Sequence, residues 1–317
     1  MSYIQTVTGK ISPETIIFCH CHEHLMLSKG KSYEINPALY IDDFDKSLTE
    51  LQDFYNHGGT TVVDAQPVGC NRMAEELVAL SEKTNVRIIS STGFHKMIFY
   101  PDNHWIFQYN TDKLADLFLH EIRSGMYVNS DASAPYEYIS AKAGIIKCAL
   151  DHVGLDYQYE KLFSAASYAA NLTNAPLMIH IEQNSDPVLL ADYLRRCHVD
   201  LNRVIFCHMD RACPDLSVHK ELCSRGIYME YDTIGRPKYH DDIKEAAIFL
   251  EMIDAGYEGK LLFSLDTTRA RLKSYTPSGV GMTYIIHTFI PLLKSYGISE
   301  DQLKKIACYN CRQILAF

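Results

Sequence analysis

Ile16-Ile17-Phe18-Cys19-His20-Cys21-His22-Glu23-His24 is an apolar run that ends in histidines at every second position. Side chains of an extended strand alternate between its two faces, so a strand here turns His20, His22 and His24 to one side. On a helix, residues two apart point in nearly opposite directions. The stretch therefore predicts a β-strand that carries metal ligands, because neutral imidazole is the commonest protein ligand for zinc-like ions.

Seven further short apolar runs follow, and amphipathic stretches with helical spacing separate them. The predicted strands cover residues 16–21, 60–65, 86–92, 144–149, 177–181, 204–207, 227–231 and 260–265. Continuous apolar strands that alternate with helices are typical of a buried parallel sheet. Eight such units most simply close into a (β/α)₈ TIM barrel, predicted as a single domain over residues 1–317. The alternative is a doubly wound open sheet.

Composition narrows the class of protein. Hydrophobic residues make up 47% and charged residues 22% of the 317 residues, as in ordinary globular enzymes. The net charge of −9 argues against nucleic acid and anionic membranes as partners. The start Met1–Gln5 has no signal-peptide pattern, and no long apolar stretch follows. We therefore expect a cytoplasmic protein with a small-molecule substrate, and the sequence is compatible with a homodimer.

The ten cysteines are expected to be reduced and buried. Cys19 and Cys21 alternate with the histidines, so they are predicted to face the surrounding helices. Cys308 and Cys311 form a CxxC pattern, which in other contexts indicates redox chemistry or half of a zinc site. Here it lies in the predicted helix 300–315 without a second CxxC, so we interpret it as core packing.

Candidate ligands stand at the carboxyl ends of five predicted strands, where barrels carry their chemistry. They are His22, His24, Lys147, His180, His208 and Asp266. Taken singly, each histidine is more simply read as a hydrogen-bonded core residue, but packing alone gives no reason for all of them to share one end. The set therefore predicts a metal centre at the carboxyl ends of the strands.

Lys147 lies among apolar neighbours in Ala143-Gly144-Ile145-Ile146-Lys147-Cys148-Ala149. A buried lysine loses its proton readily, because desolvation disfavours the ammonium form. The neutral amine can take up carbon dioxide and become a carbamate, an anion with one oxygen for each of two ions. Taken alone, such a lysine more often reaches solvent or pairs with a carboxylate, but its place between histidine-bearing strands favours the bridging hypothesis.

Five short motifs carry these residues in chain order: His22-Glu23-His24-Leu25, Gly144-Ile145-Ile146-Lys147, Ile179-His180, Cys207-His208-Met209-Asp210 and Ser264-Leu265-Asp266. With Thr92-Gly93-Phe94 and Asn310-Cys311-Arg312, their order and approximate spacing resemble the phosphotriesterase family of the amidohydrolase superfamily. The resemblance runs from about residue 6 to the C-terminus. It implies a metal-dependent hydrolase with two divalent ions, often zinc, although manganese and cobalt also suit these ligands.

The resemblance also implies roles for individual residues. His22, His24 and Asp266 would hold the buried ion, His180 and His208 the more exposed one, and carboxylated Lys147 would bridge them. Asp266 would accept a proton from the attacking bridging hydroxide, and Asp210 would relay that proton outward. Glu23 faces away from the ions on a strand, so we expect it to orient the strand.

The loops indicate an anionic substrate. Arg269, Arg271 and Lys273 follow Asp266, and Arg236 and Lys238 lie in the preceding loop. Loops after the seventh and eighth strands of barrels often hold phosphate, and Arg or Lys binds it through charge-assisted hydrogen bonds. The competing interpretation is a solvated basic loop paired with nearby carboxylates.

We therefore predict a lactonase for a small anionic lactone, in particular a phosphorylated sugar lactone. Tyr100 is a further candidate for substrate contact. His95 and Lys96 depart from the tyrosine found in several lactonases of the family at this loop, so the resemblance does not predict oxyanion stabilisation from here. The alternatives are an organophosphate hydrolase, an acyl-homoserine-type lactonase, or a metal-binding barrel without turnover.

Overall fold

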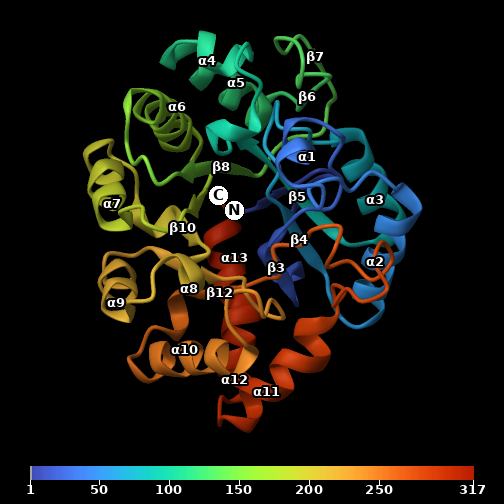
Figure 1. Cartoon of the computed structure of the whole chain (residues 1–317), viewed down its shortest axis with the longest axis vertical. Helices are drawn as coiled ribbons and strands as arrows, with labels where there is room; N and C mark the ends of the chain where they lie inside the picture. Colours follow the sequence, from blue (N-terminus) through green and yellow to red (C-terminus); the bar gives the residue numbers. More distant parts are fainter. Residues whose placement is uncertain (1) are drawn as a thin grey trace.

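All eight apolar runs form strands of one parallel sheet in the computed structural model, which describes residues 2–317. The strands in hydrogen-bonded order are β3 (Cys19–Glu23), β4 (Thr61–Asp64), β5 (Arg87–Gly93), β8 (Ile145–Leu150), β9 (Leu177–Ile181), β10 (Val204–Cys207), β11 (Tyr228–Tyr231) and β12 (Leu261–Phe263). Figure 1 shows them around a common centre with the helices outside.

The sheet curls until its two edges, β12 and β3, lie against each other. The amide of Asp266 donates to the carbonyl of His22 at 3.2 Å. The buried carboxylate of Glu23 accepts from the amides of Leu265 and Thr267, both at 2.9 Å. One side chain thus supplies part of the pairing that a continuous strand would give. The barrel prediction is confirmed, and the open-sheet alternative is wrong.

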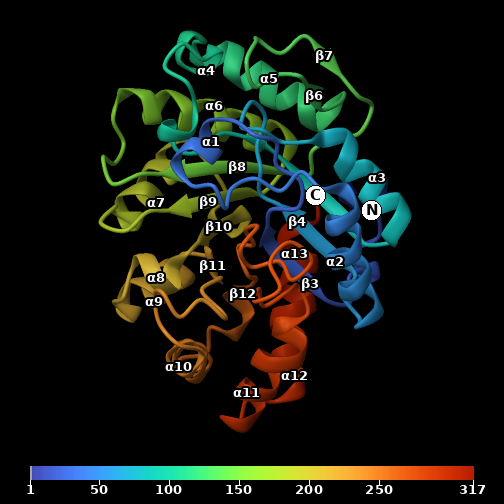
Figure 2. The ribbon, with the colours of Figure 1, turned by 45° about the vertical axis from the view of Figure 1, so that its right-hand side comes forward.

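Helices follow the strands as the amphipathic spacing predicts. They are α2 (Phe44–Asn56), α3 (Ala74–Thr84), α5 (Thr111–Arg123), α6 (Tyr157–Thr173), α7 (Pro187–Arg196), α9 (Leu216–Ser224), α10 (Asp242–Asp254) and α11 (Ile290–Ser295), preceded by the π-helical turn η5 (Ile285–Phe289). The C-terminal segment forms α12 (Glu300–Lys304), η6 (Lys305–Tyr309) and α13 (Asn310–Leu315). In Figures 1 and 2, α11 and α12 lie at the opposite end of the long axis from α4 (Trp105–Gln108) and α5.

Several shorter elements lie outside the eight-stranded sheet and the main helices. They are the hairpin β1 (Ile4–Thr6) and β2 (Gly9–Ile11), the ribbon β6 (Tyr127–Val128) and β7 (Glu137–Tyr138), the short helices α1 (Lys31–Ile35), α4 (Trp105–Gln108) and α8 (Met209–Ala212), and the 3₁₀ turns η1 (Pro13–Thr15), η2 (Met97–Phe99), η3 (Leu201–Arg203) and η4 (Glu258–Lys260). No helix among residues 2–317 has the length and apolar character that crossing a membrane requires.

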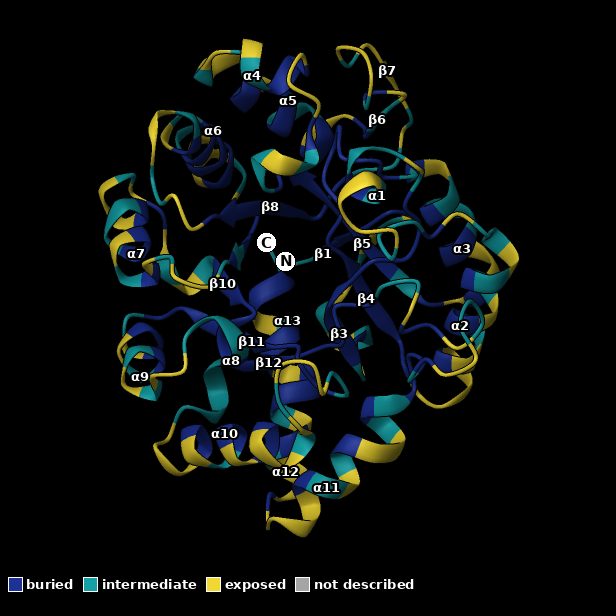
Figure 3. Cartoon of the chain, in the orientation of Figure 1, coloured by how far each residue is buried: buried dark blue, intermediate teal, exposed yellow. Residues whose placement is uncertain are grey.

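Apolar side chains fill two separate regions. The larger one lies between the sheet and the helices, and the smaller one fills the barrel interior. Side chains of α13, including Ile314 and Leu315, close the interior from the amino-terminal end, while Tyr3 and Phe317 pair through their backbones at 3.1 and 2.8 Å. Figure 3 shows the strands and the inner part of α13 as buried. The polar side chains gather instead at the opposite end of the barrel, where the strands have their carboxyl ends.

Strand β3 departs from the simple alternation that its sequence predicts. A register shift between His20 and Glu23 marks a β-bulge against β4. His20 consequently faces the helix layer, where its ring lies 4.7 Å from that of Phe54. Cys19 and Cys21 belong to the barrel interior, and the Cys21 sulfur lies 3.4 Å from that of Cys311. The predicted orientations of His20 and the two cysteines are wrong, because a bulge changes which residues share a face. Cys311 packs, as interpreted.

Replacing Glu23 with alanine is expected to destabilise the fold by about 2–6 kcal/mol. The change leaves two buried amides at the barrel seam without an acceptor, and each unsatisfied group costs about 1–3 kcal/mol. Urea unfolding measures the effect, with exposed Glu75 on α3 changed to alanine as the control, expected within about 0.5 kcal/mol of wild type. Equal stabilities of the two variants would show that Glu23 does not hold the seam.

Candidate metal centre

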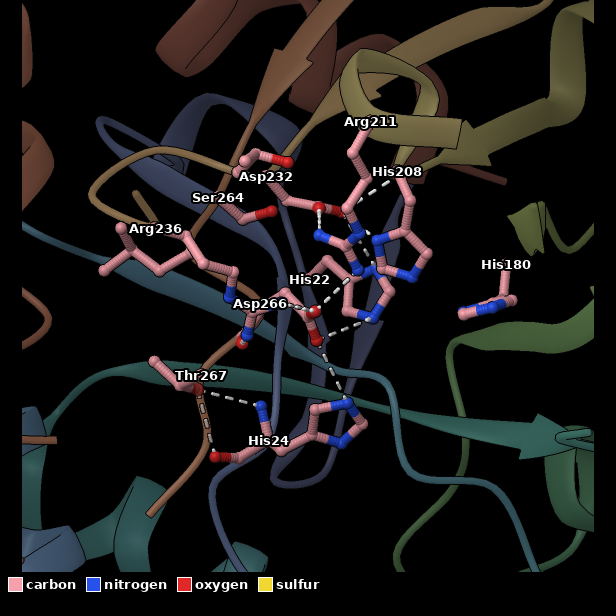
Figure 4. Close-up of polar contacts among 12 residues, drawn as sticks. His22, His24, His180, His208, Arg211, Asp232, Arg236, Ser264, Asp266 and Thr267 are labelled. Carbon is pink, nitrogen blue, oxygen red and sulfur yellow. Dashed lines mark hydrogen bonds and ion pairs between the residues drawn. The ribbon is translucent and has the colours of Figure 1, made fainter. Parts of the chain in front are cut away.

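The predicted ligands meet at the carboxyl end of the barrel. Figure 4 shows His22, His24, His208 and Asp266 close together, with His180 facing them from the other side. The Nε2 atoms of His22 and His24 lie 3.8 and 3.6 Å from Asp266 Oδ1. The ring centres of His180 and His208 are 4.4 Å apart, and those of His22 and His208 are 4.8 Å apart. Strands from opposite ends of the chain thus build one cluster.

Lys147 lies beneath this cluster in the barrel interior. Its side chain is fully buried, and its Nζ lies 3.3 Å from His22 Nε2. Gly93 on the neighbouring strand β5 has a φ of +100°, and a Cβ there would stand 2.0 Å from the carbonyl oxygen of Lys147. Only glycine therefore allows β5 to approach β8 this closely, which fixes the position of Lys147 at the floor of the site.

Two of the candidate ligands have a backbone conformation that L-residues seldom adopt. His208 has a φ of 64° and Asp266 a φ of 48°. Such left-handed conformations are uncommon outside glycine and asparagine, and they gather at functional sites, where the surrounding structure enforces them. Each of the two residues follows the end of its strand, so the turn aims its side chain back over the barrel axis.

Three of the histidines, His22, His180 and His208, have lowered pKa values that favour the neutral form, which binds metal. Burial and the Lys147 charge lower the pKa of His22 well below its ordinary value. Burial lowers the pKa of His180 to about 4, and burial and Arg211 lower that of His208. At neutral pH each imidazole therefore keeps a free lone pair for a cation.

Two buried carboxylates, one on strand β11 and one directly after it, orient two of these histidines. Glu230 Oε2 lies 3.1 Å from His22 Nδ1, and Ser264 donates to the other Glu230 oxygen. Asp232 Oδ2 lies 2.6 Å from His208 Nδ1. A carboxylate on one ring nitrogen fixes the histidine tautomer and leaves the other nitrogen for a metal. Neither residue was predicted from the sequence, although Glu230 and Asp232 stand two apart at a strand end, the same signal that identified His22 and His24.

The donor set fits a divalent cation of the zinc type. His22, His24 and Asp266 each offer a ligand atom, and the three atoms lie within 4.8 Å of one another. Imidazole nitrogens with a carboxylate oxygen suit zinc, manganese and cobalt. The orientation of His22 and His208 by buried carboxylates is the observation that favours a metal over simple core packing.

Asp266 is shared between the histidines and two arginines. Its Oδ1 faces His22 and His24, while its Oδ2 accepts from Arg211 at 2.9 Å and from Arg236 at 2.8 Å. Although burial alone would raise it, Arg236, His24 and Arg211 hold the pKa of Asp266 well below its ordinary value. The carboxylate is therefore ionised, as a metal ligand must be.

Asp210 accepts hydrogen bonds from backbone amides of the neighbouring strand end, and its role in a proton relay stays a prediction. Its Oδ2 accepts from the amides of Asp232 and Thr233 at 3.1 and 2.6 Å. The next residue, Arg211, occupies the position next to Asp266 instead. Because Asp210 and Arg211 are neighbours at the start of α8, the sequence could not show which of them turns toward the ligands.

A cavity of about 600 Å³ opens above the ligand cluster. Of the residues predicted to bind substrate, Lys238 and Arg271 line it. Arg269, Lys273 and Tyr100 do not belong to its lining. Arg269 donates to the Tyr40 carbonyl at 2.9 Å, outside the cavity.

Tyr100 and Lys273 are displaced from the cavity for different reasons. Tyr100 is buried, and its hydroxyl accepts from the amide of His95 at 2.8 Å, so it supports the loop that carries His95 and Lys96. Lys273 is exposed and lies near Gly281. Arg269, Lys273 and Tyr100 therefore lie outside the cavity lining, and their contact with substrate stays a prediction.

The cavity wall is strongly basic. Lys96, Arg211 and Arg236 line it together with Lys238 and Arg271. The facing carboxylates are Glu182, paired with Lys96, and Asp266, paired with two of the arginines. Arg271 is buried and donates to the carbonyls of Ile234 and Gly235 at 2.6 and 3.1 Å, while its Nε has no partner among residues 2–317.

Comparisons with known proteins agree with this geometry. A phospho-furanose lactonase of Mycoplasmopsis agalactiae is 26% identical over 99% of this chain and 92% of its own length. A phosphotriesterase homology protein of Escherichia coli is 27% identical over 91% of this chain and 93% of its own. The crystal structure of a lactonase from Listeria monocytogenes has a TM-score of 0.89 at 26% identity, covering 99% of both chains.

The model of the phosphotriesterase family matches residues 2–315, nearly the whole chain. This match spans all eight strands and every residue of the candidate metal centre. The chain therefore belongs to the phosphotriesterase family and is a hydrolase of that family.

Proposed function

We propose that this hydrolase opens a small anionic lactone, in particular a phosphorylated sugar lactone, with the help of two divalent ions. The observation that carries the proposal is the basic cavity wall directly above the ligand cluster, in a chain whose net charge is −9. Two curated relatives named phospho-furanose lactonase, from Mycoplasmopsis agalactiae and Mycoplasmopsis synoviae, support the same substrate class.

Five cations contribute to this wall, but they are not equally free. Arg211 and Arg236 are paired with Asp266, and Lys96 is paired with Glu182. Lys238 is exposed and has no ion pair among residues 2–317. Burial and the nearby Arg236 charge lower the pKa of Arg271 to about 10. A substrate anion bound between Arg271 and Arg236 would offset the repulsion between these two guanidinium groups. Lys238 and Arg271 are therefore our candidates for the substrate's negative group.

The bound ions would supply a nucleophilic water at neutral pH and polarise the lactone carbonyl. His22, His24 and Asp266 would hold one ion, and His180 and His208 the other. Lys147 would bridge them after its neutral amine has added to carbon dioxide, forming one N–C bond and releasing one proton. Arg211 and Arg236 keep Asp266 ionised for this role. Hydrolysis adds one water across the ring C–O bond, giving a carboxylate and a hydroxyl group.

Steady-state kinetics with matched lactones test the substrate class. Sugar lactones with and without a phosphate group, an acyl-homoserine lactone and a neutral organophosphate triester would be compared as substrates. We expect the largest kcat/KM for a phosphorylated lactone, because only that group pairs with the basic wall. Apolar Ile35, Leu39 and Phe99 line another part of the cavity and could instead contact a hydrophobic substrate. A clear preference for the triester or the acyl-lactone would therefore overturn the proposal.

Lys238→Ala is expected to lower kcat/KM for phosphorylated lactones by roughly 10–100-fold, the effect of losing one charge-assisted hydrogen bond. Unphosphorylated lactones should change little. Lys273→Ala removes the same charge from an exposed lysine outside the cavity and is the matched control. Equal effects of the two variants on both substrates would mean that Lys238 is only a solvated surface lysine.

A further inference from the structure

Arg211 connects two carboxylates that belong to different parts of the ligand cluster. It projects from the short helix α8, and its side chain is about nine-tenths buried. Its Nη1 donates to Asp232 Oδ1 at 2.6 Å, and its Nη2 donates to Asp266 Oδ2 at 2.9 Å. Figure 4 shows the guanidinium between these two carboxylates. The resemblance to the family does not assign a role to Arg211.

Each of these carboxylates turns its other oxygen toward a histidine. Asp232 Oδ2 lies 2.6 Å from the Nδ1 of His208 and accepts from the His208 amide at 3.2 Å. Asp266 Oδ1 faces the Nε2 atoms of His22 and His24 at 3.8 and 3.6 Å. Arg211 therefore orients both Asp266, a candidate ligand, and Asp232, which in turn orients the candidate ligand His208.

The shape of arginine suits this task. A guanidinium is a rigid planar fork, so its two Nη atoms fix the separation of the groups they bind. A lysine ammonium is a single point of charge and cannot impose that separation. The positive charge also offsets the repulsion between two buried carboxylates. Tyr239 covers the outer face of the guanidinium, with 5.0 Å between the guanidinium carbon and the ring centre.

Arg236 offers a natural comparison. It donates to the same Asp266 oxygen at 2.8 Å, and its other nitrogen donates to the Asp266 carbonyl at 2.7 Å. It makes no ion pair with Asp232 among residues 2–317. The two arginines therefore place the same charge on Asp266, but only Arg211 extends the connection to His208.

We infer that Arg211 is a positioning residue that couples the two halves of the metal centre, holding Asp266 toward His22 and His24 and, through Asp232, holding His208. The inference rests on the proposed metal-dependent function. It adds that the ligands of one ion and the ligands of the other are held in place by the same side chain. Loss of Arg211 leaves Asp232 without its arginine and Asp266 with Arg236 alone, so the binding of both ions should weaken.

The test measures metal binding directly. Metal-free protein is titrated with Co²⁺, and visible absorption follows the filling of the site in wild type, Arg211→Lys, Arg211→Ala and Arg236→Met. We expect Arg211→Lys and Arg211→Ala to weaken Co²⁺ binding by roughly 10–100-fold, the usual effect of losing a group that orients metal ligands. Arg236→Met should retain clearly tighter binding than either, because Asp232 and His208 keep their partner.

Chemical rescue separates positioning from a general loss of structure. Guanidinium ion at low millimolar concentration should restore part of the Co²⁺ affinity of Arg211→Ala, because the substitution leaves space for the ion. It should restore none in Arg211→Met, where the methionine side chain fills that space. Circular dichroism identifies folded variants. Co²⁺ binding by Arg211→Ala equal to that of Arg236→Met, or a folded Arg211→Ala that guanidinium does not rescue, would overturn the inference. The readout needs no substrate, so its failure is distinct from a failure to hydrolyse lactones.

Discussion

Lys147→Ala is expected to release most of the bound metal and to lower kcat/KM by roughly 10³-fold or more, a loss of about 4 kcal/mol of transition-state stabilisation. Lys147 is fully buried at the floor of the cluster, and its Nζ lies 3.3 Å from His22 Nε2. In its carbamate form it would be the one anion placed to reach both ions, so its loss should empty the site. Metal content after dialysis and steady-state kinetics on the same sample measure the two effects.

A second variant distinguishes the lost anion from a lost side-chain volume. Lys147→Ala leaves space for acetate or propionate, which should restore part of the activity when metal is also present. Lys147→Met fills that space without an anion, so short carboxylic acids should have no effect on it. Retention of two ions and full rate in both variants would rule out a bridging role for Lys147. Rescue of both variants to the same extent would indicate a general effect of the added salt.

The barrel could be predicted because its strands are apolar on both faces. Ile145 fills the interior and Ile146 packs against the helices, so the strand is a continuous hydrophobic run in the sequence. The helices were equally clear from their one-sided apolar spacing. The β1–β2 hairpin and the β6–β7 ribbon were missed, because strands of three and two residues are too short for any periodicity.

The ligand set could be predicted because the carboxyl ends of parallel strands converge whatever the details of packing. His180 and Asp266 needed only their places at strand ends. His20 could not be excluded in this way, because the bulge in β3 depends on pairing with β4 rather than on local sequence. Glu230 and Asp232 carried the same two-residue signal as the histidines, but carboxylates at strand ends have many other uses.

Loop residues were the least predictable part of the site. Arg269 and Arg271 stand two apart in one basic stretch, yet Arg271 turns into the cavity while Arg269 binds the Tyr40 carbonyl. Asp210 likewise accepts from backbone amides, while its neighbour Arg211 turns toward Asp266. Side-chain direction in a loop is set by contacts with distant segments, and a single sequence contains no record of those contacts.

Asp266→Asn is expected to abolish tight binding of at least one ion and to lower kcat by roughly 10³-fold, equivalent to about 4 kcal/mol. The carboxylate faces His22 and His24 with one oxygen and accepts from Arg211 and Arg236 with the other. An amide has one oxygen, so it cannot bind a cation and accept from both arginines at once. In either orientation its NH₂ group would face the cation or the arginine donors. The substitution also leaves two buried arginines short of their shared anion.

Metal content, turnover and stability should be measured on Asp266→Asn beside Asp254→Asn, which makes the same chemical change at an exposed position at the end of α10. The control should match wild type, with stability within about 0.5 kcal/mol. Hydrolysis lost together with metal supports an enzyme whose nucleophile depends on Asp266. An Asp266→Asn variant that kept both ions and full turnover would contradict the assignment of Asp266. A wild-type chain that bound two ions without hydrolysing any lactone or ester would instead favour the metal-binding barrel without turnover.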